Sequence, residues 1–462
     1  MTSNESPEAV ANGLDSLRLQ PRTNGAKDLD VFVMSESGKP VYCYSRREDS
    51  ITLMGVCVAL IHVTDKLEND TIRHIQTIGG LRIAFALKSP LIICFVFRVN
   101  LGIDANILIN QVNAQIISIL TAKTLKSVFE QRPTFDLKRL LSGSEKLIDT
   151  LIDVILSPIN ANKSENNCNN QMNAFLSSSM TTSKTIGNQS IINNRSTIST
   201  RVYIPIRVMA AQLRESVYNI INSCASSAPN VIFSLLFSVD KKAKEEYNGS
   251  NNYIQLICVC NQFKARLNPL DIQLLYSLVM ASESQLASVE SFFLPICLPR
   301  FDSNNFLHTH ISYLSNEYCL ALLTTDREEF HKCQLTKESI IDRLAKVHLT
   351  PSRSNLSDLS QPQLQYLWYQ SHRQSVLWRQ SPVFEFSSLN HYITNRMLKS
   401  NLKTFWLRSE SDGLLLGWHS PTFQLYAQFD VTITQLQALT AIQAIIKWIK
   451  KEEDKFVIKD YQ

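Results

Sequence analysis

Two short apolar runs around a glycine-bearing turn, at residues 30–45 (DVFVMSESGKPVYCYS), restrict the possible folds of this chain more than any other feature. Residues 31–34 and 41–44 are apolar at every position, and Gly38 between them can adopt the positive φ that closes a short hairpin. Because successive side chains of a strand point to opposite faces of a sheet, such runs predict a hairpin that is covered on both faces. The rest of the chain must therefore supply two covers.

The next segment is a predicted helix that is apolar on every side. Asp49 or Ser50 can cap a helix that runs to about Glu68, and its middle reads LMGVCVALI. A helix of this kind is normally buried on more than one face, and it is shorter than the roughly 20 apolar residues that span a bilayer. We expect one face to lie on the hairpin's sheet and the other to need a second partner, from this chain or from another.

Three further strands, over residues 71–78, 81–87 and 91–99, complete a predicted sheet of five strands. Two helices follow, over 105–131 and 136–156, and the second carries a clear apolar stripe. We expect these two helices to cover the face of the sheet that the helix over 49–68 leaves open.

The same order of elements then returns twice. The first repeat has a helix over 206–223, strands over 231–239 and 253–264, a helix over 268–284, strands over 292–298, 306–314 and 318–324, and a helix capped by Thr325 or Asp326 that ends near 346. The second repeat has strands over 364–369 and 375–378, a helix over 387–399, strands over 403–408, 414–419 and 422–429, and a helix over 432–451. The apolar face predicted for this last helix is Leu436, Leu439, Ile442, Ile446 and Ile449. The sequence therefore predicts an α+β chain of three tandem domains, each a five-stranded antiparallel sheet with flanking helices.

Composition marks the domain boundaries. Polar residues predict a disordered tail over 1–28, a disordered insertion rich in Asn, Ser and Thr over 158–200, and a linker over 350–361. The three domains then span 29–157, 201–349 and 362–462.

Charge and cysteine content restrict the class of protein. The chain has 46 basic and 41 acidic residues, and a net charge of +5 is too small for a dedicated nucleic-acid binder, although a weak preference for an anionic membrane is left open. Most of the ten cysteines lie in apolar runs and predict buried thiols in a reducing compartment. Residues 1–30 lack the apolar stretch of a secretory signal, so we expect a cytoplasmic protein.

The sequence offers no convincing catalytic motif. It contains none of the common glycine patterns of phosphate-binding, dinucleotide-binding or hydrolase loops, and LLSGSE at 140–145 reads as part of a helix. His308 and His310 share a strand face that Cys297 or Cys319 could approach, but four ligands at a recognisable zinc spacing are absent. We predict no metal and no cofactor, and keep a metal-dependent enzyme as an alternative.

Two groups of basic residues are candidates for contact with a membrane surface. One group lies in a hairpin turn and at the end of its second strand, and the other lies at the end of the terminal helix. The groups consist of Lys241, Lys242, Lys244, Lys264 and Arg266, and of Lys447, Lys450 and Lys451. Each is interpreted as an ordinary solvated face unless the two groups converge, in which case anionic lipid headgroups are the expected contact.

Several sequence blocks, taken together, resemble one family. They are DVFVMSESGKPVYCYS, TLMGVCVALI, RPTFDLKRLLSGSEKLID, LNPLDIQLLYSLV, FLHTHISYL, TTDREEF and IKWIKKEEDKF. In this order, from about residue 30 to 458, they are similar to the SAND family, the Mon subunits of the Mon-Ccz complexes of vacuole and late-endosome fusion. The long insertion and the short N-terminal tail depart from the family pattern.

The resemblance implies three longin domains, and guanine nucleotide exchange activity toward a late-endosomal Rab GTPase (Rab seven) that is exercised only as a heterodimer with the Ccz subunit. It also implies peripheral association with a phosphoinositide-containing late endosome, lysosome or vacuole membrane. A non-catalytic longin scaffold or vesicle-trafficking adaptor is the alternative. No covalent catalysis is expected of the chain by itself.

We expect the first domain to carry this activity, because its first helix has more apolar surface than one sheet can bury. The candidate contacts with the partner and the Rab are Leu53, Met54, Gly55, Val56, Cys57, Leu60 and Ile61, with Gly55 allowing close approach.

Overall fold

The computed structural model describes most of the chain between residues 29 and 456. The described ranges are 29–45, 50–68, 72–76, 81–98, 105–160, 204–240, 253–347, 363–379, 397 and 402–456, apart from 205, 208, 264, 287–289, 372–374, 410–412 and 421–422. The predicted tail over 1–28 and the predicted linker over 350–361 lie outside these ranges, as does nearly all of the predicted insertion.

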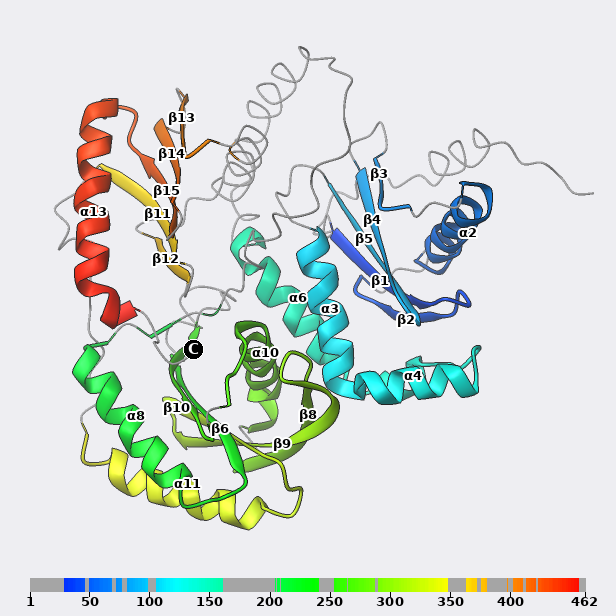
Figure 1. Ribbon diagram of the computed structural model, residues 1–462, viewed down its shortest axis with the longest axis horizontal. Helices are drawn as coiled ribbons and strands as arrows, with labels where there is room; N and C mark the ends of the chain where they lie inside the picture. The colour runs from blue at the N-terminus through cyan, green and yellow to red at the C-terminus, as the bar shows by residue number, and fades with distance from the viewer. Residues whose placement is uncertain are drawn as a thin grey trace, which may run out of the picture. The chain divides into compact units, whose positions relative to one another are not determined.

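The first domain contains the predicted five-stranded antiparallel sheet, drawn in blue in Figure 1. Gly38 closes the opening hairpin with φ +82°, and its amide donates to the Ser35 carbonyl at 2.8 Å, as the sequence predicts. The strands stand in the order β2-β1-β5-β4-β3. They are β1 (Leu29–Ser35), β2 (Pro40–Cys43), β3 (His74–Gln76), β4 (Leu81–Lys88) and β5 (Leu91–Arg98).

Helix α2 (Ser50–Glu68) covers one face of this sheet. Its buried side chains form one cluster with Phe32 and Met34 of β1 and with Ile92 and Cys94 of β5. Every residue of β1 is buried, so side chains on both faces of the strand are shielded from water, as its uninterrupted apolar run predicts.

The two helices predicted to follow the sheet are each broken in the structure. Thr121, with φ +66°, separates α3 (Ala105–Leu120) from α4 (Ala122–Gln131). Gly143, with φ +88°, lies between α5 (Lys138–Leu141) and α6 (Glu145–Asn160). The interpretation of LLSGSE as the inside of a helix is therefore wrong. Apolar spacing continues across a short break, so periodicity alone does not reveal the turn.

The second domain repeats the arrangement with a sheet in the order β7-β6-β10-β9-β8. Its elements are α8 (Ala211–Ala225), β6 (Val231–Val239), β7 (Ile254–Asn261), α10 (Pro269–Leu286), β8 (Ser291–Leu298), β9 (Asp302–Ser315), β10 (Tyr318–Thr324) and α11 (Phe330–Leu344). Helix α10 packs on one face of the sheet, while α8 and α11 pack on the other.

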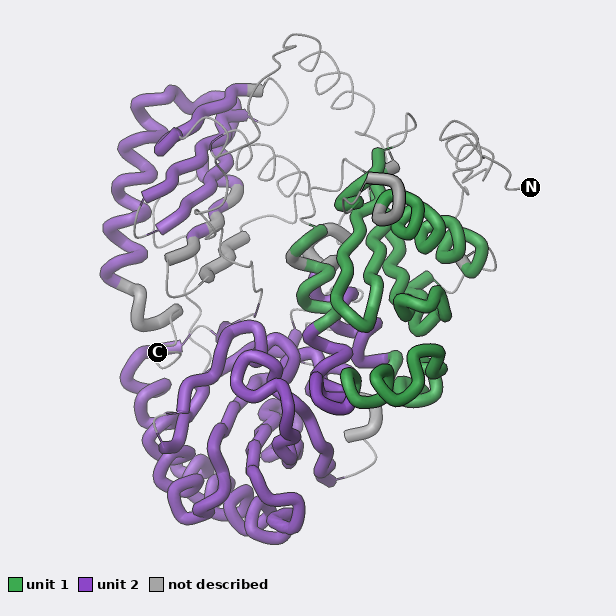
Figure 2. The backbone as a smooth tube through the Cα atoms, turned by 45° about the vertical axis from the view of Figure 1, so that its right-hand side comes forward, with its two compact units in different colours: residues 1–113, 125–145 green, residues 114–124, 146–462 purple. Residues whose placement is uncertain are grey.

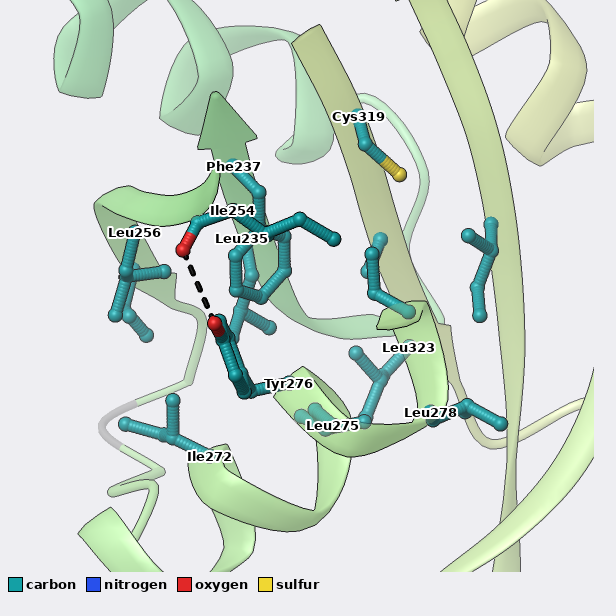
Figure 3. Close-up of a cluster of buried hydrophobic side chains, with 14 of the residues drawn as sticks. Leu235, Phe237, Ile254, Leu256, Ile272, Leu275, Tyr276, Leu278, Cys319 and Leu323 are labelled. Carbon is teal, nitrogen blue, oxygen red and sulfur yellow. Dashed lines mark hydrogen bonds between the residues drawn. The ribbon is translucent and has the colours of Figure 1, made fainter. Parts of the chain in front are cut away.

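Helix α10 lies in a large apolar core of the described residues. In Figure 3, Tyr276 of α10 lies among leucine, isoleucine and phenylalanine side chains of the sheet, and its hydroxyl donates to the Ile254 carbonyl at 3.1 Å. Val154 and Leu147 of α6 join this core. The helix predicted over 136–156 was expected to cover the first sheet, so its packing on the second domain is a finding that periodicity did not indicate.

The chain divides into two compact units that do not coincide with the three sheets. Residues 1–113 and 125–145 form one unit, and residues 114–124 and 146–462 form the other (Figure 2). All of α6 except its first residue therefore belongs to the unit that holds the second sheet.

Helix α11 begins later than predicted. Neither Thr325 nor Asp326 caps it, because residues 326–329 form a turn in which the Asp326 carboxylate accepts the Glu328 amide at 2.9 Å. Glu329 is buried at the end of this turn, and its carboxylate accepts from Asn230 at 2.8 Å and from Lys332 at 2.7 Å. Glu329 thus ties the start of the helix to the end of the sheet.

The third domain has the same strand order, β12-β11-β15-β14-β13, with the terminal helix α13 packed on the sheet. Its elements are β11 (Leu364–Ser371), β12 (Ser375–Arg379), β13 (Thr404–Ser409), β14 (Gly413–His419), β15 (Phe423–Phe429) and α13 (Gln435–Phe456). The helix predicted over 387–399 lies outside the described residues apart from Met397.

The predicted apolar face of α13 is partly wrong. Leu436 is 74% exposed, whereas Ala438, Ala441 and Ile445 are buried against the sheet. The choice of large apolar residues overlooked these small alanine side chains. Ile442 and Ile449 are buried as predicted.

No helix in the described ranges combines the length and the apolar character that crossing a bilayer requires.

Candidate partner interface on helix α2

Four of the seven candidate contact residues of α2 face its own sheet. Leu53, Met54, Cys57 and Ile61 are buried in the cluster that α2 forms with the strands. Contact of these four with a partner would require the helix to leave the sheet. Of the predicted residues, only Gly55, Val56 and Leu60 can contact a partner while α2 stays on its sheet.

The buried face includes a pair of neighbouring thiols. A hydrogen bond with Cys57, followed by burial, raises the pKa of the Cys94 thiol well above its usual value. The nine described cysteines are all free, and eight of them are buried, which agrees with the predicted buried thiols. A raised pKa keeps the Cys94 thiol protonated and unreactive, so this pair serves packing.

The opposite side of α2 is open to solvent. Ile51 is 69% exposed and Val63 is 48% exposed, and half-buried Val56 and Leu60 lie at the margin. We call the exposed residues the outer face of α2. It consists of Ile51, Thr52, Gly55, Ala59, His62 and Val63. This face carries no acidic side chain, lysine or arginine, and most of it is apolar.

Gly55 lies in the middle of the outer face. A Cβ atom placed on Gly55 would have no atom within 4 Å, so the backbone of α2 is accessible there. The prediction included Gly55 but omitted Ile51, Ala59 and Val63. These residues recur at intervals of four with Gly55, a helical spacing that was visible in the sequence and could have found them.

Local hydrogen bonds hold the start of β1 and the end of the hairpin in place. The Asp30 carboxylate accepts the Val31 amide at 2.9 Å and the Ser45 amide at 3.0 Å. Val58 of α2 lies beneath the hairpin turn, 3.5 Å from the position of a Cβ on Gly38. The sheet, the turn and the inner side of α2 therefore form a continuous support for the outer face.

The two histidines of β9 have structural surroundings. His308 stacks on Phe293 with ring centroids 5.6 Å apart, and burial lowers its pKa. His310 is fully buried beside Phe330, and burial, with the Lys337 charge as a smaller cause, lowers its pKa to about 4. Cys319 lies in the core on the α10 side of the sheet, away from them. Within the described ranges, no three His, Cys, Asp or Glu residues are grouped to hold a metal ion.

The structure describes four of the eight residues in the predicted basic groups. Arg266 is exposed in the loop after β7, and Lys447, Lys450 and Lys451 are exposed on α13. Lys241, Lys242, Lys244 and Lys264 lie outside the described residues. Contact of either group with a membrane remains a prediction.

Family models match all three domains. Residues 30–151 match the first longin domain of FUZ, MON1 and HPS1, residues 254–342 match the second, and residues 345–453 match the third. Together these matches cover most of the chain and follow the order of the three sheets.

Curated relatives match the chain over nearly its whole length. Protein SAND of Takifugu rubripes is 30% identical over 456 residues, covering 93% of this chain and 75% of the relative. The vacuolar fusion protein MON1 homolog A of Gallus gallus is 29% identical over 453 residues, covering 93% of this chain and 71% of the relative. The vacuolar fusion protein MON1 of Cryptococcus neoformans is 26% identical over 493 residues, covering 100% of this chain and 68% of the relative.

These matches confirm the predicted family and the predicted fold. The chain belongs to the MON1 family, also named SAND, and is built from three longin domains.

Proposed function

We propose that this chain is one subunit of a heterodimeric guanine nucleotide exchange factor, which pairs with a Ccz subunit and activates a late-endosomal Rab GTPase (Rab seven). Relatives in the family are named vacuolar fusion proteins, which supports a role in vesicle fusion and trafficking. The partner and the exchange activity are parts of the proposal.

The observation that carries the proposal is the outer face of α2. Ile51 and Val63 expose large apolar side chains on a helix whose inner side is fully used by its own sheet. Burial of this strip by a partner would remove apolar surface from water, at about 25 cal/mol for each Å². We assign the strip to the Ccz subunit, with the Rab bound at the surface that the two subunits share.

Exchange of this kind needs binding energy and no covalent chemistry. A factor accelerates nucleotide release when it binds the nucleotide-free Rab more tightly than the nucleotide-bound Rab, so it shifts the population toward the open state. Displacement of the Rab switch segments weakens the contacts to magnesium and phosphate. A shaped, partly apolar surface is sufficient for this work.

Substitution of Gly55 gives a sharp test. A tryptophan there would project from the outer face and block close approach, and its Cβ would meet no atom from outside its own helix within 4 Å. We expect Gly55→Trp to abolish recovery of the Ccz subunit and acceleration of GDP release from the Rab, while the urea midpoint of the chain does not fall. Leu53→Asp is a weaker probe, because Leu53 is buried and its loss would also disrupt the domain.

Leu335→Trp is the matched control, since Leu335 is an exposed residue of α11 in the second domain. It should leave heterodimer recovery intact. If Gly55→Trp pairs normally with the Ccz subunit, the assignment of the outer face is wrong. If the wild-type pair binds the Rab without changing the rate of GDP release, the chain is a scaffold and the exchange proposal fails.

A further inference from the structure

The contact between strand β9 and helix α11 buries polar atoms that have no hydrogen-bond partner among the described residues. They are both ring nitrogens of His310, the hydroxyl of Ser312 and the Oε1 atom of Gln334. His310 and Ser312 are 0% exposed. Proteins rarely leave buried polar atoms in this state, because loss of contact with bulk water is costly unless another hydrogen bond replaces it. These groups therefore need a partner that the described side chains do not supply.

The strand register places His310 and Ser312 on one face of the sheet. They are two residues apart on β9, so their side chains point to the same side. Their cross-strand neighbours Leu322 and Leu320 belong to the cluster that includes buried side chains of α11. The ring of Phe330, the first residue of α11, lies 5.4 Å from the His310 ring between centroids. Both polar side chains of β9 therefore point toward α11.

Helix α11 brings polar groups to the same region. Lys337 is 3% exposed, and its ammonium donates to the Glu290 carboxylate at 3.0 Å. Glu290 directly precedes the residue of β8 that pairs with Ser312. Burial, and then the Lys337 charge, lowers the pKa of His310 to about 4, while the Gln334 amide opposes the shift. Lys337 and Gln334 thus both lie near the His310 ring.

The unpaired groups include both donors and acceptors. With its pKa lowered to about 4, His310 is neutral at pH 7, and a neutral imidazole has one donor nitrogen and one acceptor nitrogen. The Ser312 hydroxyl donates and accepts, whereas Gln334 Oε1 only accepts. Water suits such a mixed set, because each molecule both donates and accepts hydrogen bonds. An anion does not, because the acceptor nitrogen and the amide oxygen would repel it.

We propose that the contact between β9 and α11 is a binding site for ordered water, which bridges His310 and Ser312 of the strand to Gln334 of the helix. Water molecules donate to Gln334 Oε1 and to the acceptor nitrogen of His310, and accept from the Ser312 hydroxyl. The inference is independent of the proposed function. It means that α11 is joined to the sheet partly through water, whereas α10 on the other face lies in an apolar core.

The stability of a Ser312→Ala variant of the full chain tests the site. If the hydroxyl is hydrogen-bonded to buried water, the substitution removes that bond and the urea midpoint falls. If the hydroxyl has no partner, the substitution relieves the cost of burying an unpaired polar group, and the midpoint stays or rises. We expect the midpoint to fall at pH 7, where His310 is neutral. A midpoint that stays or rises overturns the proposal.

Thr309→Val is the matched control. Thr309 directly precedes His310 on β9, is 0% exposed, and its hydroxyl is also buried without a partner among the described residues. Its cross-strand neighbour Leu323 belongs to the core around α10, so Thr309 points away from α11. Valine has nearly the shape of threonine, so the urea midpoint should stay or rise. An equal fall in both variants would show that the loss is not specific to the α11 side, and would refute the proposal.

A crystal structure of the full chain observes the site directly. At a resolution that shows ordered water, we expect a water molecule within hydrogen-bond distance of Ser312 and of His310 or Gln334. A direct hydrogen bond between His310 and Gln334, with no water between β9 and α11, contradicts the proposal. Electron density for an anion or a larger molecule also contradicts it, because the site would then hold a different ligand.

Discussion

Helices α2 and α10 occupy the same place in two successive longin domains, yet only one of them is covered. Each follows the first hairpin of its sheet, and each is apolar around most of its circumference. All nine residues from Asp271 to Val279 of α10 are buried, whereas α2 exposes Ile51, Gly55, Ala59 and Val63. Leu147 and Val154 of α6 belong to the same apolar core as α10, in addition to the side chains of the sheet.

This comparison shows what kind of structure completes such a helix. Leu147 and Val154 of α6 supply the apolar contacts to the core around α10 from within the chain. In the second domain, α6 therefore adds a layer of side chains to the core that holds α10, in addition to the sheet. For α2 we propose that the Ccz subunit supplies that layer.

The largest expected effect comes from truncating a buried side chain of α10. Leu275 of α10 is fully buried, so Leu275→Ala should lower the free energy of unfolding by about 2–5 kcal/mol through lost burial and the resulting cavity. Val63→Ala on the outer face of α2 should change it by less than about 0.5 kcal/mol, because Val63 is half exposed. Urea unfolding followed by circular dichroism would compare the two. Similar losses would show that α2 is as covered as α10.

The second domain should also lose more stability at acidic pH than the first domain does. His310 is fully buried with a pKa lowered to about 4, whereas the described histidines of the first domain, His62 and His74, are exposed. Because the pKa is lowered on folding, the free energy of unfolding is highest above the unfolded pKa of about 6.5 and falls as the pH drops toward 4. Near pH 5 this loss of stability is about 2 kcal/mol.

His310→Leu removes this proton-binding group. The variant should therefore unfold at a higher urea concentration than the wild type near pH 5, with a smaller difference at pH 7. If the variant and the wild type differ by the same urea midpoint at pH 5 and at pH 7, His310 is not held neutral by its burial.

The smallest expected effect concerns the helix backbone of α2. Gly55→Ala should raise the free energy of unfolding by about 0.5–1 kcal/mol, because alanine is the better helix former and its Cβ meets no atom within 4 Å. A thermal melt would measure this gain. Recovery of the Ccz subunit should drop only slightly, in contrast to Gly55→Trp, since a methyl group still permits close packing. A loss of stability would show that position 55 is already crowded.

Sequence reasoning found the hairpin, the three sheets and the order of their helices, because strand alternation and helical spacing are local properties. It did not find the breaks at Thr121 and Gly143, where apolar spacing continues through a turn. It also judged α2 to have surplus apolar surface without noting that α10 is apolar around most of its circumference as well. Leu147 and Val154 are distant in sequence from α10 but join the same core, which local patterns do not reveal.

For the site, the sequence identified the right helix but not which side of it is open. Leu53 and Val56 are three residues apart and look equivalent in a helix that is apolar all round, yet Leu53 is buried and Val56 lies at the margin of the outer face. Which face meets the sheet depends on the register between α2 and the strands. That register is a tertiary property.

The packing of α6 on the second domain determines how this protein can be divided into fragments. A fragment that ends at residue 157 would carry Leu147 and Val154 without the core that buries them. A fragment that begins at residue 201 would leave the α10 core without those two side chains, and would expose apolar surface that the intact chain hides. A cut near residue 144, in the turn before α6, would keep Leu147 and Val154 together with that core.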